Sequence, residues 1–561
     1  MKKSIIFLLF INICSSFAQK NYPQNQFRNP LDIPIVLAGT FGELRTNHFH
    51  SGIDIKTNGV SGKKVYAAHQ GYVSRIKISL WGYGKAIYVT HPNGYTTVYA
   101  HLKKFSDKIE NYIKAKQYQK KSFEIQLFPG KGELPIETDE IIAYSGNTGG
   151  STAPHLHFEI RDTKTEKIIN PLLFGYDVKD NIHPTVLGLR ISPLGKKSAI
   201  NNLPVAQEIP LTKINAKTYV SKTIKATGKI GISIRTHDLL NYAPNKNGVY
   251  SIETYVNDTL KYHHDLETFS FDESKYINLL IDYAYYATKS RKFQKTYVEP
   301  FNKLSIYKNT VKKGYLNISD QKQYTVLIKI SDFAKNVTTV KIPIQRDSII
   351  TPVLKEATKT PYYIPTNQYC VFKNKNVELR FPKATFYENM YLDFNVEDDH
   401  IHVHKPILPL SKNYTIAYFM DSISPKQQKH AYLALKYKNN YNYVSSDKKG
   451  NKLYANTKSL GDFTVKYDSI APKIEHLSFY KNQNLANHKS ISVVIKDLQT
   501  DIKSYYATID NEWILMEYEP KKNLLTFDLN DLKTQNKKHI FQLKIEDLLG
   551  NTNSLTIDFT K

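Results

Sequence analysis

The chain has 561 residues, which predicts roughly three to five domains, and its 41% apolar content excludes a disordered chain. Its 41 tyrosines favour β-structure. The net charge of +26 favours an anionic polymer as partner, although lysines that only solvate the faces of β-domains would give the same charge.

Residues 1–18 have the features of a cleavable signal peptide. Two lysines precede an apolar run over residues 5–13, and residues 16–18 (Ser-Phe-Ala) form a small-x-small cleavage site. A lipid anchor on Cys14 is disfavoured because Ile13 stands where such sites need a small residue. We therefore expect an exported protein in the periplasm, with secretion or cell-surface display as alternatives, no transmembrane segment in the mature chain and no nucleic-acid partner.

Cysteine adds no covalent constraint to this picture. Because Cys14 would leave with the signal peptide, Cys370 would be alone and no intramolecular disulfide is expected. Cys370 is interpreted as a small buried apolar residue.

After an N-terminal linker over residues 19–32, the segment 33–177 is predicted to fold as an antiparallel sheet. Alternating apolar and polar residues predict strands over 85–90, 96–102 and 156–160, with turn residues between them.

Three motifs in this segment carry residue types that bind zinc. They are HFHSGID with His50 and Asp54, VYAHL with His101, and PHLHFEI with His155 and His157. A catalytic zinc needs three protein ligands and one open position. Two of the five groups are therefore left for proton transfer or oxyanion stabilisation, and the spacing alone leaves open which two.

Local geometry supports the grouping. Because side chains alternate across a strand, His155 and His157 share one face, while Leu156 and Phe158 point to the core. Gly52 disfavours a regular helix and favours a tight turn that brings the two groups of the first motif together.

Other histidines are interpreted differently. His402 and His404 form a second H-x-H, which we interpret as a strand face without metal. His48, His69 and His91 are interpreted as polar surface or supporting residues.

The stretches RTNHFHSGIDI, GYGKAIYVTHPNGYTTVYAHL and SGNTGGSTAPHLHFEI resemble, in the same order, the motifs of the LytM/lysostaphin-type zinc metallopeptidases over about residues 33–175. The resemblance implies one Zn²⁺ per catalytic domain, with the ligands His50, Asp54 and His157. It also implies that His101 and His155 are catalytic histidines, which orient and deprotonate water and stabilise the oxyanion. Ala153 departs from the glycine that the family often has there, by one methyl group.

The segment 103–140 is longer than the connection usual in this family. A short helix is expected from Ser106 to about Lys120. Ser106 can cap it, acidic residues lie in its first turn, and one face is apolar through Ile109, Tyr112 and Ile113. The segment is interpreted as a surface insertion, or alternatively as a wall or lid of the substrate groove.

The rest of the chain is predicted to form about three β-sandwich-like domains, so the fold class is mainly β. Segments 178–345 and 468–561 both begin with Asp-x-Ile before a proline and both end in alternating strands around an Asp-x-x-x-Asn turn. This diverged repeat resembles immunoglobulin-like domains. Segment 346–467 begins similarly but lacks the closing hairpin, and is predicted to be a β-domain of uncertain type.

The resemblance implies a zinc-dependent endopeptidase that hydrolyses peptide crosslinks of bacterial cell-wall peptidoglycan. Stem peptides or crossbridges would be the substrate, and an envelope protein is a further partner expected at the C-terminal β-domains. One alternative is a non-catalytic cell-wall scaffold or amidase activator, which the five intact residues disfavour. The other is an endopeptidase that acts on envelope proteins.

Overall fold

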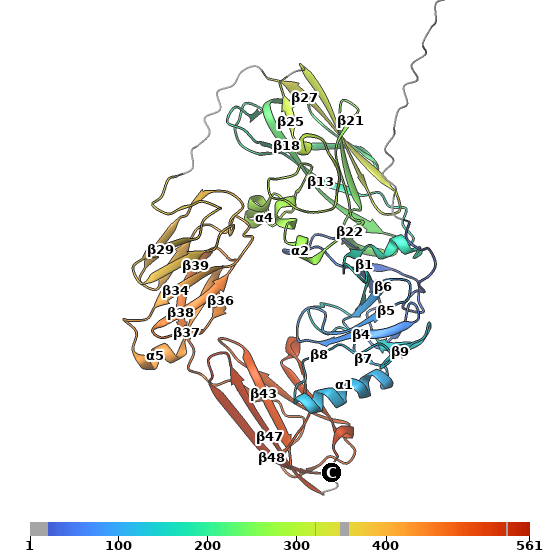
Figure 1. Cartoon of the computed structure of the whole chain (residues 1–561), viewed down its shortest axis with the longest axis vertical. Coiled ribbons are helices and arrows are strands. Elements are labelled where there is room, and N and C mark those ends of the chain that lie inside the picture. The colour runs from blue at the N-terminus through green and yellow to red at the C-terminus, as the bar shows by residue number, and fades with distance from the viewer. Residues whose placement is uncertain (1–20, 320, 348–357, 534–536) are drawn as a thin grey trace, which may run out of the picture.

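A computed structural model describes residues 21–319, 321–347, 358–533 and 537–561, so the predicted signal peptide lies outside the described residues. The chain is mainly β, with an N-terminal antiparallel-sheet domain followed by several β-domains, as predicted. The domains follow one another around a ring, and the C-terminal domain returns to the N-terminal one (Figure 1). No helix in these ranges has the length and apolar character of a membrane span.

The N-terminal domain is built on an antiparallel sheet with the main path β1-β2-β11-β6-β5-β4-β8. These strands are β1 (Leu37–Gly39), β2 (Ile53–Lys56), β11 (His155–Asp162), β6 (Tyr95–Ala100), β5 (Lys85–Thr90), β4 (Gly71–Ile78) and β8 (Ile125–Leu127). A smaller sheet contains β3 (Lys64–Tyr66), β10 (Ile141–Tyr144) and β7 (Lys104–Phe105). Leu156 and Phe158 of β11 are fully buried in the core, as the alternation predicted.

The long segment after β6 contains α1 (Asp107–Lys120), and Ile109 and Ile113 on its inner face are fully buried. The capping prediction is wrong, because the Ser106 hydroxyl makes no cap hydrogen bond. The Glu110 N–H donates the first helical hydrogen bond to the Ser106 carbonyl at 2.7 Å. The Glu110 carboxylate accepts from the N–H of Phe105, just before the helix, at 2.9 Å.

The second domain forms one connected sheet of 14 strands with the main path β15-β13-β18-β27-β26-β20-β21-β24. These strands are β15 (Gln207–Ile209), β13 (Thr185–Pro193), β18 (Ile224–Leu240), β27 (Val337–Arg346), β26 (Gln323–Ser331), β20 (Ser251–Val256), β21 (Thr259–Asp265) and β24 (Tyr307–Thr310). The domain also holds the short helices α2 (Phe271–Ser274), α3 (Ile277–Leu280) and α4 (Tyr283–Lys289). Strands β26 and β27 form the predicted closing hairpin.

The third domain has two five-stranded antiparallel sheets that enclose one apolar core. One sheet contains β29 (Cys370–Asn374), β30 (Val377–Phe381), β34 (Tyr414–Phe419), β38 (Lys452–Thr457) and β37 (Asp447–Lys449). The other contains β32 (Phe394–Glu397), β33 (His400–Val403), β39 (Gly461–Tyr467), β35 (Ala431–Tyr437) and β36 (Asn440–Ser445). One helix, α5 (Pro425–His430), precedes β35. Cys370 is half-buried at the start of β29 and is a free thiol.

The C-terminal domain also has two sheets. One contains β40 (Lys473–Glu475), β42 (Ser490–Lys496), β46 (Leu524–Asp528) and β45 (Glu517–Glu519). The other contains β41 (Gln483–Asn484), β48 (Thr552–Thr560), β47 (Lys538–Asp547), β43 (Ile502–Ile509) and β44 (Glu512–Trp513). Strands β47 and β48 form the second predicted closing hairpin.

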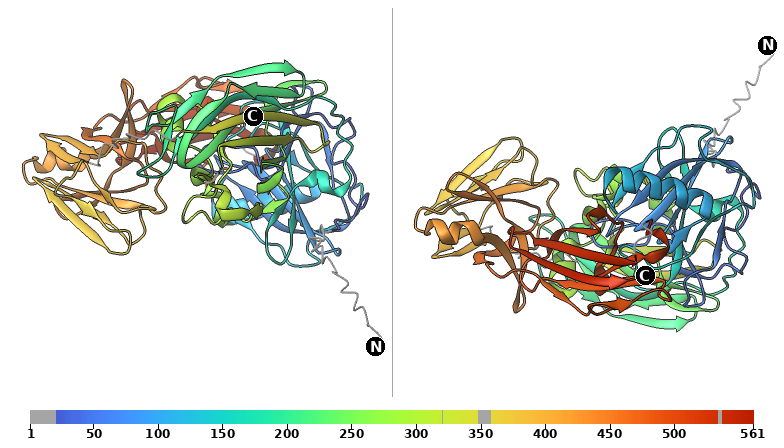
Figure 2. Two further views of the ribbon diagram at one scale, coloured as in Figure 1. Left: turned by 90° about the horizontal axis from the view of Figure 1, so that it is seen from above. Right: turned by 90° about the horizontal axis from the view of Figure 1, so that it is seen from below.

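Both neighbours in the ring pack against the N-terminal domain. The second domain shares an apolar cluster with it, in which Phe49 and Phe41 lie against Phe269 with ring centroids 5.1 and 4.8 Å apart. The C-terminal domain packs on α1, where the Tyr118 ring lies 5.3 Å from that of Trp513. Seen from below, it extends from the third domain to the N-terminal one (Figure 2).

Gly52 gives a test of the backbone path at the first motif. A Cβ atom at this position would lie 2.3 Å from the Phe158 carbonyl oxygen of β11. We expect Gly52→Ala to lower the free energy of unfolding by about 1–3 kcal/mol, because the strand pairing must open to admit the methyl group. Thermal unfolding followed by circular dichroism measures this. Gly130→Ala is the control, since its Cβ would meet nothing closer than 3.9 Å. Equal stability of the two variants would contradict the packing described here.

Candidate active site

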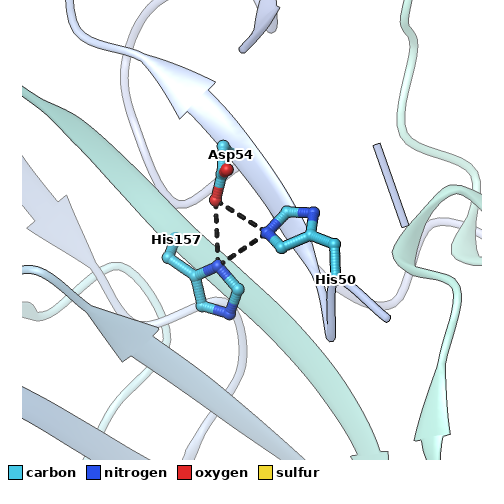
Figure 3. Close-up of side chains that lie close together, drawn as sticks. All are labelled: His50, Asp54 and His157. Atoms are coloured by element: carbon cyan, nitrogen blue, oxygen red, sulfur yellow. Dashed lines mark hydrogen bonds and ion pairs between the residues drawn. The ribbon is translucent and has the colours of Figure 1, made fainter. Parts of the chain in front are cut away.

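The structure brings together His50, Asp54 and His157, which the resemblance implies as metal ligands (Figure 3). His50 precedes β2, Asp54 lies within it, and His157 lies directly opposite Asp54 on β11. His50 Nε2 and His157 Nδ1 are 3.0 and 2.9 Å from Asp54 Oδ1, and 3.1 Å from each other. All three side chains are buried.

The hydrogen bonds on the far sides of both rings leave the inner nitrogens free to bind a cation. His50 Nδ1 lies 2.7 Å from the Thr40 carbonyl oxygen, and His157 Nε2 lies 2.9 Å from Glu159 Oε1. Because these oxygens only accept, each outer nitrogen carries the proton. Two lone pairs and a carboxylate oxygen therefore face one another, and a cation is needed between them. This nitrogen and oxygen donor set fits zinc.

The charges around the site favour a positive charge at its centre. Burial disfavours ionisation of Asp54, but His50 and the neighbouring imidazoles outweigh it and hold the Asp54 pKa well below its usual range. Burial also opposes protonation of His157, yet its hydrogen bonds with Asp54 and Glu159 raise the pKa to about 9. A metal ion would take the place of that proton.

His101 and His155 lie beside this group. His155 Nε2 is 3.4 Å from Asp54 Oδ1, and the His101 and His155 ring centroids are 4.8 Å apart. The Nδ1 atoms of both rings face carbonyl oxygens, those of Thr148 at 2.9 Å and Ala153 at 2.8 Å. His101 Nε2 is therefore unprotonated and can accept a proton, whereas His155 Nε2 faces Asp54 Oδ1. The structure thus gathers all five predicted residues, while their individual roles stay a prediction.

His101 is held in an unfavourable backbone conformation and in a buried position. Its φ of 59° lies in the left-handed region, which costs a non-glycine residue roughly 1–3 kcal/mol. Burial, together with the nearby His157 and His155, lowers the pKa of His101 to about 3. The ring is therefore neutral at neutral pH.

Glu159 is a residue that the sequence reasoning missed. It is fully buried, and it accepts hydrogen bonds from His157, from Ser51 at 2.6 Å, from Tyr83, and from Arg161 at 2.7 Å. Such a carboxylate fixes the orientation of a ligand imidazole. The signal was present in the sequence, because the alternation that groups His155 and His157 also places Glu159 and Arg161 on that face of β11.

A loop of the N-terminal domain that contacts the C-terminal domain supports His101 and His155. The loop 147–151 contributes the Thr148 carbonyl under His101, and its Ser151 hydroxyl lies 3.1 Å from His155 Nδ1. The Lys521 ammonium donates to the carbonyl oxygens of Asn147 and, at 3.0 Å, of Ser151. Beside it, Glu517 forms an ion pair with the buried Lys85 at 2.9 Å.

The remaining histidines lie apart from the site. His48 is exposed and His69 half-buried, in keeping with their interpretation. His91 is instead buried, with contacts to the Gln70 carbonyl at 2.8 Å and the Thr97 hydroxyl at 2.7 Å, so it is a core residue and the surface interpretation is wrong. His402 lies on a strand and contacts Asp462 at 2.6 Å.

Comparison with known families supports a metallopeptidase. The model of Peptidase family M23 matches residues 48–118. That of the Zu5-like domain matches residues 361–468, which covers most of the segment 346–467 predicted as a β-domain of uncertain type. The DD-carboxypeptidase/endopeptidase Mpg of Neisseria meningitidis is 33% identical over 118 residues, 21% of this chain and 21% of that protein. An uncharacterized metalloprotease of Haemophilus influenzae is 33% identical over 123 residues, 22% of this chain and 20% of the relative.

The chain thus matches about a fifth of the length of these curated relatives. Among solved structures, the catalytic domain of lysostaphin from Staphylococcus simulans is 22% identical and covers 25% of this chain and 91% of that one, with a TM-score of 0.19. A zinc containing peptidase from Vibrio cholerae is 23% identical and covers 28% and 41%, with a TM-score of 0.20. Because these TM-scores are low, the family of this domain is assigned from the sequence matches.

The His/Asp group and these matches define a metallopeptidase domain. As the resemblance implied, the chain carries a domain of Peptidase family M23, the LytM/lysostaphin family, and a Zu5-like domain follows further along the chain.

The substitution Glu159→Gln tests whether Glu159 strengthens metal binding by holding the His157 ring. The neutral amide cannot hold the His157 N–H as strongly, so zinc affinity should fall by about 10–100-fold. Competition with a chromophoric chelator measures the affinity. The control is Glu166→Gln, which removes an exposed carboxylate from the same hairpin. Unchanged affinity in Glu159→Gln, with the fold intact by circular dichroism, would show that Glu159 does not act on the metal site.

Proposed function

We propose that this chain is a zinc-dependent endopeptidase that hydrolyses peptide crosslinks of bacterial cell-wall peptidoglycan. The observation that carries the proposal is the convergence of His50, Asp54 and His157 beside the imidazoles of His101 and His155. When bound, zinc supplies Lewis acidity, which polarises a carbonyl oxygen and lowers the pKa of water to about 7.

The chain's own residues handle the protons. His101 is neutral at neutral pH, and its Nδ1 proton is held by the Thr148 carbonyl. We assign to His101 and His155 the uptake, at Nε2, of the proton lost by the attacking water. The protonated ring then donates to the leaving amine and stabilises the oxygen that gains charge at the scissile carbon.

The substrate class is supported by charge and by the relatives. A net charge of +26 suits the anionic polymers of a cell envelope. The Neisseria relative is named a DD-carboxypeptidase/endopeptidase. We place the protein in the periplasm because of the signal peptide predicted over residues 1–18, and we expect its β-domains to hold an envelope protein or the wall itself.

Release of peptides from purified sacculi tests the proposed activity. Zinc-loaded protein should release crosslink-derived peptides, detected by mass spectrometry, and chelation should stop the release. Asp54→Ala should abolish it because one ligand is lost. His101→Ala should lower the rate by about 10²- to 10⁴-fold because proton transfer is lost. Alanine variants as active as the parent protein would show that the site is assigned wrongly.

Two controls separate this activity from the other functions considered. A scaffold or amidase activator has no need of metal, so purified protein without stoichiometric zinc and without hydrolysis would favour it. Cleavage of an unstructured protein such as casein, together with no release of peptides from sacculi, would favour an envelope-protein endopeptidase.

Lys521 tests whether the C-terminal domain contributes to catalysis. Its ammonium holds the loop 147–151, which orients both His101 and His155. Lys521→Met should lower kcat by roughly threefold to tenfold, equivalent to about 1 kcal/mol, and leave zinc content unchanged. Lys522→Met is the matched control, because Lys522 is exposed and the described contacts of the loop do not include it. Equal kcat in both variants would assign Lys521 no part in positioning.

A further inference from the structure

Two groups of three aspartates recur at equivalent places in the second and C-terminal domains. They are Asp180, Asp238 and Asp332 in the second domain, and Asp468, Asp497 and Asp547 in the C-terminal domain. In each group the carboxylate oxygens lie within 4.8 Å of one another. The three members come from the Asp-x-Ile start of the domain, the end of a long strand, and the closing Asp-x-x-x-Asn turn.

Equivalent hydrogen bonds from an asparagine support each of the two groups. The Asn336 amide donates to Asp332 Oδ2 at 2.8 Å and to the Asp180 carbonyl at 3.3 Å. In the C-terminal domain the equivalent amide, that of Asn551, donates to Asp547 Oδ2 at 2.8 Å and to the Asp468 carbonyl at 3.0 Å. The repeat found in the sequence is therefore a repeated arrangement of carboxylates.

The groups differ in how their charges are satisfied. In the C-terminal group the Thr500 hydroxyl donates to Asp468 Oδ2 at 2.9 Å, and the Thr500 N–H donates to Asp497 Oδ1 at 2.7 Å. The residue at the equivalent position in the second domain is Asn241, whose amide oxygen accepts from the Asn181 N–H at 3.3 Å. Within the described residues, no hydroxyl group is seen to donate to Asp180, Asp238 or Asp332.

Asp238 consequently has a buried oxygen without a partner. Its side chain is 3% exposed, and Oδ1 has no hydrogen-bond partner within the described ranges. No ion pair joins Asp180, Asp238 or Asp332 to a lysine, arginine or histidine in the part of the chain that the structure describes. Burial and the nearby Asp180 and Asp332 raise the pKa of Asp238 to about 8, so this carboxyl group holds either a proton or a cation at neutral pH.

A small cavity opens onto this group at the junction with the N-terminal domain. Its volume is about 30 Å³, which has room for a single ion or water molecule. Asp180 and Asp238 line it together with Thr40 and with apolar side chains, while Asp332 completes the carboxylate group from outside this lining. Three carboxylate oxygens are ligands for a hard cation of flexible coordination, which describes Ca²⁺ better than Mg²⁺ or Zn²⁺.

We propose that Asp180, Asp238 and Asp332 form a Ca²⁺ site at the junction of the peptidase domain with the second domain. The ion neutralises the mutual repulsion of the three carboxylates and fixes the start of the second domain against the closing hairpin. In the C-terminal domain, hydrogen bonds from Thr500 fill part of this role. The site stabilises the junction beside Thr40, whose carbonyl holds the His50 ring.

The test is a titration of the zinc-loaded mature chain with CaCl₂ by isothermal calorimetry, after dialysis against metal-free buffer. We expect one Ca²⁺ per chain and a rise of roughly 5 °C in unfolding temperature at saturating Ca²⁺. Asp238→Asn, nearly isosteric, should lose both effects. Asp497→Asn, the matched change in the C-terminal group, should keep both.

Binding of Tb³⁺ gives a second readout that does not depend on stability. Tyr250 lines the cavity, so excitation of tyrosine should produce Tb³⁺ luminescence that Ca²⁺ displaces and that Asp238→Asn lacks. Absence of Ca²⁺ binding at millimolar concentration, an equal response to Mg²⁺, or loss of binding in Asp497→Asn would overturn the proposal. Because hydrolysis is not measured, the outcome is independent of the proposed peptidase activity.

Discussion

The pairing register of β2 with β11 is the constraint on which the metal group depends. Antiparallel pairing sets His157 directly opposite Asp54, and pairing of β11 with β6 sets Ala100 on the other side of His157. His101 follows at the end of β6. A shift of one residue would turn the ligand side chains toward the core and the apolar ones toward the site. Burial of Leu156 and Phe158 therefore fixes the chemistry on the opposite face.

The buried charges impose a second requirement, which a proton or a metal ion at the centre satisfies. Asp54 and Glu159 are both ionised in a nearly dry environment, with His157 between them and Arg161 behind. Hydrogen bonds keep each carboxylate in place, so little reorganisation is needed when a cation binds. The imidazoles of His101 and His155 lie beside this arrangement, with ring centroids 4.8 Å apart.

Much of the site and of the fold class follows from local patterns in the sequence. Alternation predicts the shared face of His155 and His157, and the closing hairpins follow from their Asp-x-x-x-Asn turns. Tyr83 and Lys521 escape such reasoning, because their contacts join segments distant in sequence and no local period marks them. Ser106 shows the converse. The residue type favours a cap, but the Ser106 hydroxyl makes no cap hydrogen bond, and Glu110 of the first turn binds the N–H of Phe105 before the helix.

The second and C-terminal domains both contact the N-terminal domain close to the His/Asp group. The second domain packs behind the first motif, where the Phe49 N–H donates to Ser274 at 2.9 Å. The C-terminal domain holds the loop 147–151 from the opposite side through Lys521. His50, His101 and His155 are thus each oriented by a backbone segment that contacts another domain, whereas Glu159 of the same strand orients His157. Relative motion of these domains would shift the hydrogen bonds that fix His50, His101 and His155.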